Sequence, residues 1–199
     1  MRIASLTLLC LALAVIPASA QVLYSNGPIN GTTDAWTINF GYVVSDTFTL
    51  SAAATTGTIQ FGVWEFPGDV MSTVDYTVSS TENGAGVGAT ANVSDKFISS
   101  NQYGYDIDQI TFTSGSFALA AGTYWLNLYN ATVPSGDPVY WDENSGPSSA
   151  SESAVGTIPS EAFTINGSSS SGTTPEPSSI MLFGSGILGL AGILRRKLF

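Results

Sequence analysis

The middle of the chain alternates apolar and polar residues with a period of two. Trp36, Ile38 and Phe40 fall on one side of an extended segment, and the residues between them are polar. Such alternation is typical of half-buried β-strands. Similar rows are Phe48 and Leu50; Ile59, Phe61 and Val63; Val74, Tyr76 and Val78; Ile110 and Phe112; Tyr124, Leu126 and Leu128; and Phe163 and Ile165. Turn-forming sequences such as Asn83-Gly84 separate the rows. We therefore predict an all-β fold, a single β-sandwich or jelly-roll domain over residues 21–166.

The N-terminal segment differs from this pattern. Arg2 precedes a mostly apolar run over residues 3–16, and a small-residue site with Ala18 and Ala20 follows. These three parts predict a signal peptide over residues 1–20, exported through the Sec translocon and cleaved so that Gln21 becomes the first residue. Cleavage removes Cys10, the only cysteine, so the predicted mature chain has no disulfide.

The C-terminal segment has three parts as well. Residues 167–174 are rich in Gly, Ser and Thr and predict a linker to the tail over residues 175–199. An extended Pro175-Glu176-Pro177 element then precedes an apolar stretch, predicted as a transmembrane helix over residues 180–194. The basic residues that follow would hold this end of the helix on the cytoplasmic side; they are Arg195, Arg196 and Lys197.

This ordered tail resembles the sorting tail of the PEP-CTERM proteins of bacteria with an outer membrane. The shared features are the Pro-Glu-Pro motif, the glycine-rich apolar helix with Gly184-Ser185-Gly186, and the terminal basic cluster. The resemblance implies recognition of Pro175, Glu176 and Pro177 by an exosortase, a membrane enzyme that would cut near the motif. It also implies a bacterium that makes exopolysaccharide, an inner-membrane intermediate, and a final place at the cell surface or outside the cell. The alternative is an ordinary single-pass anchor.

Charge and composition exclude several functions. Between Gln21 and Pro177 the chain has fifteen carboxylates and only Lys96 as a base, a formal charge of −14. Such a body repels nucleic acid and anionic lipid, so neither is an expected partner. The chain has no histidine, and the predicted mature form has no cysteine. A Ser-His-Asp triad, a cysteine nucleophile and a histidine-ligated metal centre are therefore excluded.

Carboxylate chemistry remains open at two places. Asp106 and Asp108 would share one face of a strand about 7 Å apart, within the roughly 6.5–9.5 Å expected for an inverting glycosidase pair. A solvated strand end is the favoured interpretation of so short a motif. Separately, a loop with Gly and Pro contains a group of oxygen ligands suited to calcium, although a polar loop is the default. These candidates are Asp137, Asp142 and Glu143, with Asn144 beside them.

Two aromatic residues are candidates for glycan contact. Trp125 and Tyr129 are expected on the face opposite Tyr124, Leu126 and Leu128, where two rings could support sugar rings. Packing in the core explains them as well, and we favour it.

The leading hypothesis is an exported, non-enzymatic envelope or extracellular-matrix protein without a cofactor, associating with extracellular polysaccharide. One alternative is a secreted carbohydrate-binding module, with or without calcium. The other is a carboxylate-based glycoside hydrolase.

Overall fold

The computed structural model describes residues 20–169 and residue 186. The predicted signal peptide therefore lies outside the described residues except for Ala20, and so do the end of the linker and the tail except for Gly186, which is helical. No helix in the described part of the chain is long and apolar enough to cross a membrane. The predicted transmembrane helix falls almost wholly outside that part.

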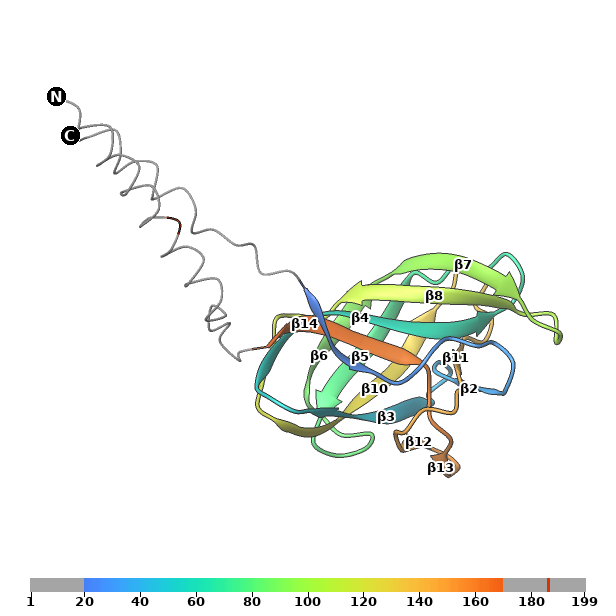
Figure 1. Cartoon of the computed structure of the whole chain (residues 1–199). Coiled ribbons are helices and arrows are strands. Elements are labelled where there is room, and N and C mark those ends of the chain that lie inside the picture. The colour runs from blue at the N-terminus through green and yellow to red at the C-terminus, as the bar shows by residue number, and fades with distance from the viewer. Residues whose placement is uncertain (1–19, 170–185, 187–199) are drawn as a thin grey trace, which may run out of the picture.

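Two antiparallel sheets, one of them strongly curled, form the described body (Figure 1). This confirms the prediction of an all-β fold. The larger sheet has eight strands: β1 (Gln21–Ser25), β2 (Ala35–Thr37), β4 (Ala54–Glu65), β7 (Ser94–Ser100), β8 (Asp106–Thr113), β9 (Ala118–Leu119), β11 (Tyr140–Asp142) and β14 (Phe163–Ser169). The smaller sheet has six: β3 (Val43–Leu50), β5 (Thr73–Ser79), β6 (Val87–Asn92), β10 (Gly122–Thr132), β12 (Ala150–Glu152) and β13 (Gly156–Ile158).

Strand β4 is the centre of the larger sheet. It pairs with β14 and β11 along one edge and with β9 and β8 along the other. A shift in its register with β14 leaves Gly57 as an extra residue in β4. This bulge resets the alternation, so that Thr56 before it and Ile59, Phe61 and Val63 after it are all buried.

The inner faces of the two sheets share one hydrophobic core. The predicted apolar rows of β3, β4, β5, β8, β10 and β14 all contribute to it. Trp141 lies near its centre, packs edge-on against Phe61 and Phe163, and donates its indole N–H to the Ala162 carbonyl. The largest buried side chains are Trp141, Tyr76, Phe48, Phe61 and Phe163.

The predicted row of Trp36, Ile38 and Phe40 is wrong at its end. Strand β2 stops at Thr37, and Phe40 adopts a left-handed φ of 56°. A turn over Phe40 and Gly41 therefore begins two residues after Ile38, and the Phe40 ring is 63 % exposed. Of Ile38 and Phe40, the last two residues of the predicted row, only Ile38 lies in the core.

Both ends of the described body lie side by side. β1 begins at Gln21, the residue that the predicted cleavage would expose, and Gln21 pairs with Gly167 of β14. β14 continues to Ser169, three residues beyond the expected end of the domain, and Ser169 pairs with Ala54 at the start of β4. The chain thus enters and leaves the body at the same end (Figure 1).

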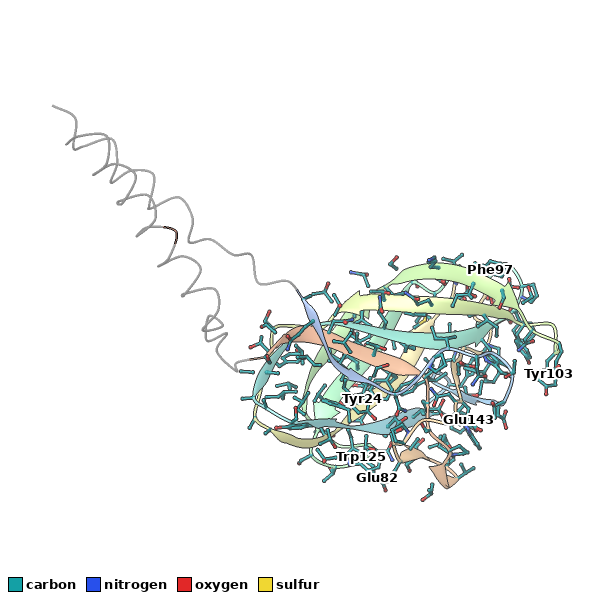
Figure 2. The ribbon with its side chains drawn as sticks, viewed as in Figure 1. Tyr24, Glu82, Phe97, Tyr103, Trp125 and Glu143 are labelled. Atoms are coloured by element: carbon teal, nitrogen blue, oxygen red, sulfur yellow. The ribbon has the colours of Figure 1, made fainter. Side chains whose placement is uncertain are left out.

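Strand β7 forms an exposed edge of the larger sheet and pairs only with β8. Phe97, at the upper edge of the body in Figure 2, and Ile98 are both largely exposed there. Lys96, the only basic residue of the body, precedes them. A lysine on an edge strand opposes pairing with another chain, because pairing would bury its charge.

Candidate functional site

The sorting residues predicted at the two ends fall mostly outside the described residues. Ala18, the Pro175–Pro177 motif and the basic residues 195–197 are all in that group. Ala20 is exposed directly before β1. The remaining candidate site residues, which are carboxylates and aromatic rings, lie within the described body.

The predicted calcium ligands do not come together. Asp142 points away from the core, where its carboxylate accepts hydrogen bonds from the backbone N–H groups of Asn30 and Gly31 and from the Trp64 indole. Glu143, the next residue, accepts a hydrogen bond from the Trp36 indole. Adjacent residues of an extended segment point to opposite faces, which is why the two carboxylates diverge.

Asp137 lies five residues before Asp142, outside β11. Among residues 20–169, no group of three or more carboxylates is arranged to hold a metal ion. Burial raises the pKa of the Asp142 carboxyl, and its three hydrogen-bond donors lower it in part. Asp142 holds a loop and an indole in place, and the structure corrects its predicted role as one of three converging ligands.

Asp106 and Asp108 do share one face of β8, as their spacing predicted. In register they lie opposite Glu65 and Val63 of β4, which places them on the inner face near the end of the larger sheet. Asp108 is only 4 % exposed, so the favoured interpretation of a solvated strand end is wrong for this residue, and Glu65 is not exposed at all. Both oxygens of Glu65 and Oδ2 of Asp108 are buried without a hydrogen-bond partner.

Burial and the nearby negative charges favour the protonated forms of the Glu65 and Asp108 carboxyl groups. Burial is the largest cause that raises the pKa of Glu65 to about 8, and the nearby charges of Asp95, Asp108, Asp69 and Asp106 raise it further. Burial likewise raises the pKa of Asp108 to about 7, with Asp95 and Asp106 adding to the effect. An uncharged carboxyl costs far less to bury than a carboxylate, so the cluster is stable mainly in its protonated form.

A second polar group lies between the sheets around Asn26. Its side-chain nitrogen lies within 2.6–3.1 Å of an oxygen of Asp46, the hydroxyls of Ser148 and Ser160, and the carbonyl of Glu161. Asp46 and Glu161 are fully buried. Burial raises the pKa of Asp46 to about 6, and burial followed by the charge of Asp46 raises the pKa of Glu161 well above its usual value.

Trp125 and Tyr129 lie on the face of the smaller sheet opposite Leu126 and Leu128, as the alternation predicted, and neither belongs to the core, so the favoured interpretation of core packing is wrong. Neither ring contacts another aromatic ring of the described body. Asn127 lies between them and is buried beneath the turn after β5, because its side chain bonds to Asn83 and Thr77. A hollow of about 270 Å³ adjoins Tyr129 but not Trp125. The two rings therefore do not form one continuous surface.

The sequence reasoning missed a larger aromatic surface on the larger sheet. Five rings contact one another in a continuous group, which we call the aromatic row. Tyr103 stacks on Trp64 with ring centroids 5.7 Å apart, and Tyr105 links Trp64 to the two remaining rings. The members of the aromatic row are Trp64, Phe66, Tyr103, Tyr105 and Tyr140.

The aromatic row is partly open and rigidly held. Tyr103 is 57 % exposed and Phe66 is 39 % exposed, whereas Trp64 is nearly buried. The turn that carries Tyr103 and Tyr105 is tied by Asn101, whose side-chain oxygen accepts hydrogen bonds from both of their backbone N–H groups. Gly104 supplies the left-handed φ of 87° that this turn requires. Trp64 is fixed from below by its 2.6 Å bond to Asp142.

A local signal for this row exists in the sequence. Trp64 and Phe66 alternate with Glu65, and Tyr103-Gly104-Tyr105 forms an aromatic turn. The pairing of β4 with β8 and β11 brings these segments together. That pairing spans some forty to eighty residues of sequence, which is beyond the reach of a periodicity argument.

The comparisons with known proteins identify the sorting tail of the chain. Residues 173–197 match the PEP-CTERM protein-sorting motif. The chain therefore carries this motif, which implies an exported protein that an exosortase processes and anchors at the cell surface. The comparison with curated proteins finds no match.

The polar group around Asn26 leads to a first prediction. Asn26→Ala removes the donor to buried Asp46 and leaves that acceptor short of a partner. We expect a loss of about 2–3 kcal/mol in the free energy of unfolding. Urea unfolding of the exported protein measures it. Asn92→Ala, at an exposed position, is the matched control and should change stability by less than about 0.5 kcal/mol. Equal effects of the two substitutions would contradict a stabilising role for this group.

The cluster around Glu65 leads to a second prediction. Because the folded pKa of about 8 exceeds the ordinary value of 4.5, the folded protein binds this proton more tightly than the unfolded chain. The stabilisation of the folded state by the proton on Glu65 is complete below about pH 4.5 and is lost as the pH rises through 8. The raised pKa values of Asp108, Asp46 and Glu161 act in the same direction.

Thermal unfolding at pH 5, 6.5 and 8 should therefore show a melting temperature that falls with pH. Glu65→Gln is uncharged at every pH, so its melting temperature should fall less and exceed that of the wild type at pH 8 by at least about 2 °C, the equivalent of about 1 kcal/mol. Glu82→Gln, at an exposed turn position (Figure 2), is the control and should keep the slope of the wild type. A wild-type melting temperature that rises from pH 5 to pH 8 would refute the protonated cluster.

Proposed function

We propose that this chain is a non-enzymatic protein of the bacterial cell envelope or extracellular matrix, released or re-anchored when an exosortase cuts near Pro175, Glu176 and Pro177. The observation that carries the proposal is the match of residues 173–197 to the PEP-CTERM sorting motif. A protein sorted in this way acts outside the cytoplasmic membrane, and the body must supply whatever function it has there.

The arrangement of the two ends of the body is consistent with such sorting. Gln21 and Gly167 are paired, so the signal peptide and the sorting tail are attached at the same end of the body. Both of these apolar segments enter a membrane in the proposed pathway. Because both segments are attached at the same end of the body, both can enter the membrane without passing over the surface of the body.

The state of the carboxylates supports a non-enzymatic role. Hydrolysis of a glycoside by an inverting pair requires both carboxyl groups to reach the scissile bond from a cleft. Of the predicted pair Asp106 and Asp108, Asp108 is buried on the inner face of the larger sheet beside the buried Glu65, so its carboxyl group does not open onto a cleft. The glycoside-hydrolase alternative is therefore the weakest of the three hypotheses.

A carbohydrate-binding role for the body is the second candidate. It is favoured by the aromatic row, in which partly exposed rings lie in mutual contact on a rigid turn. Trp125 and Tyr129, the positions predicted for this role, lack such contact. This alternative adds a ligand to the envelope protein and leaves its sorting unchanged.

Mass spectrometry of the mature protein from its native cells tests the sorting proposal. We expect the wild type to begin at Gln21 and to end near Pro177, and a deletion of residues 175–177 to retain the tail. A deletion of the same length over residues 170–172 is the matched control and should be processed like the wild type. A wild-type protein that still carries residues 180–199 would mean that the tail is a plain membrane anchor.

A further inference from the structure

We propose that the aromatic row binds a neutral polysaccharide chain. This inference rests on the proposed function, because it names the ligand that an exported envelope protein would meet with this surface. The row comprises Trp64, Phe66, Tyr103, Tyr105 and Tyr140.

The position of the row in the body is the first argument. Ala54, at the start of β4, pairs with Ser169, where the described body leads into the linker and tail. Trp64 lies ten residues further along the same strand, roughly 30 Å away at the rise of a β-strand. The aromatic row is therefore at the end of the body farthest from both attached segments. Figure 2 shows Tyr103 at this far end. A protein held at the membrane by its tail would present the row outward.

The chemistry of the exposed rings is the second argument. A sugar ring has an apolar face of C–H groups, and the negative face of an aromatic ring attracts their partial positive charge. Tyr103 offers such a face, and its other side is already covered by Trp64, with an angle of 20° between the ring planes. Phe66 offers a second exposed ring on the far side of Tyr105. The separate faces of the Tyr103 and Phe66 rings could each contact one sugar unit of the same polysaccharide chain.

Polar groups beside the rings suit hydroxyl groups. A hollow of about 150 Å³ is lined by Trp64, Tyr105, Tyr140, Ala35 and Asp34. Asp34 is exposed, and one of its oxygens accepts a hydrogen bond from the backbone N–H of Ala35. The other oxygen and the phenol groups are able to bond the hydroxyls that project from the edge of a sugar ring. The hollow is smaller than the 300–1,000 Å³ typical of sites that enclose a ligand, so it fits a chain lying along the surface.

The charge of the body decides which polysaccharide fits. The segment between Gln21 and Pro177 has a formal charge of −14. Uronate-rich or sulfated chains would be repelled by this field, whereas a neutral chain is not affected by it. The row also has a carboxylate at its rim and no basic side chain among the residues that form it, which again excludes an anionic ligand.

Rigidity is the last argument. Binding loses affinity when side chains and loops must be ordered first. Asn101 holds the turn with Tyr103 and Tyr105, and Asp142 holds Trp64 from the opposite side. The rings are therefore ordered before any ligand arrives. A rigid, partly exposed row of rings is more consistent with ligand contact than with incidental surface packing.

Affinity electrophoresis of the exported protein tests the proposal. Gels containing dextran, laminarin, hydroxyethylcellulose, mannan or the neutral extracellular polysaccharide of the native cells are compared with plain gels and with gels containing alginate. We expect at least one neutral polysaccharide to retard the wild type and alginate to leave it unretarded. Tyr103→Ala and Phe66→Ala should each weaken retardation roughly two- to tenfold, which is the value of one aromatic contact.

Two variants separate ring stacking from other effects. Tyr103→Phe keeps the ring and should retain most of the retardation, whereas Trp125→Ala removes a ring from the other sheet and should behave like the wild type. Both exposed positions, Tyr103 and Phe66, lie outside the core, so these variants should melt at the temperature of the wild type.

Several outcomes would overturn the inference. The first is that none of the neutral gels retards the wild type, and the second is that only alginate retards it. The third is that Trp125→Ala loses the retardation while Tyr103→Ala keeps it. Self-association that depends on Tyr103, measured by sedimentation, in the absence of retardation would assign the row to a second copy of the chain. The sorting proposal is unaffected by these results, because it is tested by the ends of the mature protein. If a neutral polysaccharide retards the protein but the tail remains uncleaved, only the sorting proposal is contradicted.

Discussion

The pairing of β4 on both of its edges is the constraint on which the rest of the structure depends. The predicted mature chain has no cysteine, so no disulfide joins its parts, and burial between the sheets must hold them together. β4 supplies Ile59, Phe61 and Val63 to that core and joins β14 and β11 on one edge to β9 and β8 on the other. Its start lies beside the end of the last strand, and its end carries Trp64. One strand therefore connects the attachment point of the tail, the core and the aromatic row.

Burial of acids is the second feature that shapes the body, and it follows from its composition. With fifteen carboxylates in the chain and a single lysine in the body, few acidic side chains can find a basic partner. Glu65 and Glu161 are instead buried, where burial raises the pKa of each carboxyl group. Protonation removes most of the cost of burying them, since a neutral carboxyl needs no counter-charge. The consequence is a fold whose stability is linked to pH in the direction opposite to that of a protein held by salt bridges.

The sequence predicted the strands well and the contacts between distant strands poorly. Alternation is a local property, so it correctly placed Leu126 and Leu128 in the core and Trp125 and Tyr129 on the outer face. It was wrong at Phe40, where a left-handed turn ended the strand. It placed Asp142 and Glu143 in one ligand group, although neighbouring extended residues diverge. It missed the aromatic row, because Trp64, Tyr103 and Tyr140 meet only through strand pairing. The tail was recognised because its signal is an ordered set of neighbouring residues.

The two ends of the larger sheet have different roles. At one end, Gln21, Gly167 and Ser169 lie close together, and the segments that direct export and sorting are attached there. At the other end, the turn of Asn101 to Tyr105 holds exposed rings that make no contribution to the core. Exposed aromatic groups carry a cost in solubility, and the strong negative charge of the body offsets that cost. The same charge repels anionic ligands from the surface. A neutral polysaccharide satisfies both conditions, because it presents apolar ring faces to the aromatic row and adds no charge to the acidic body.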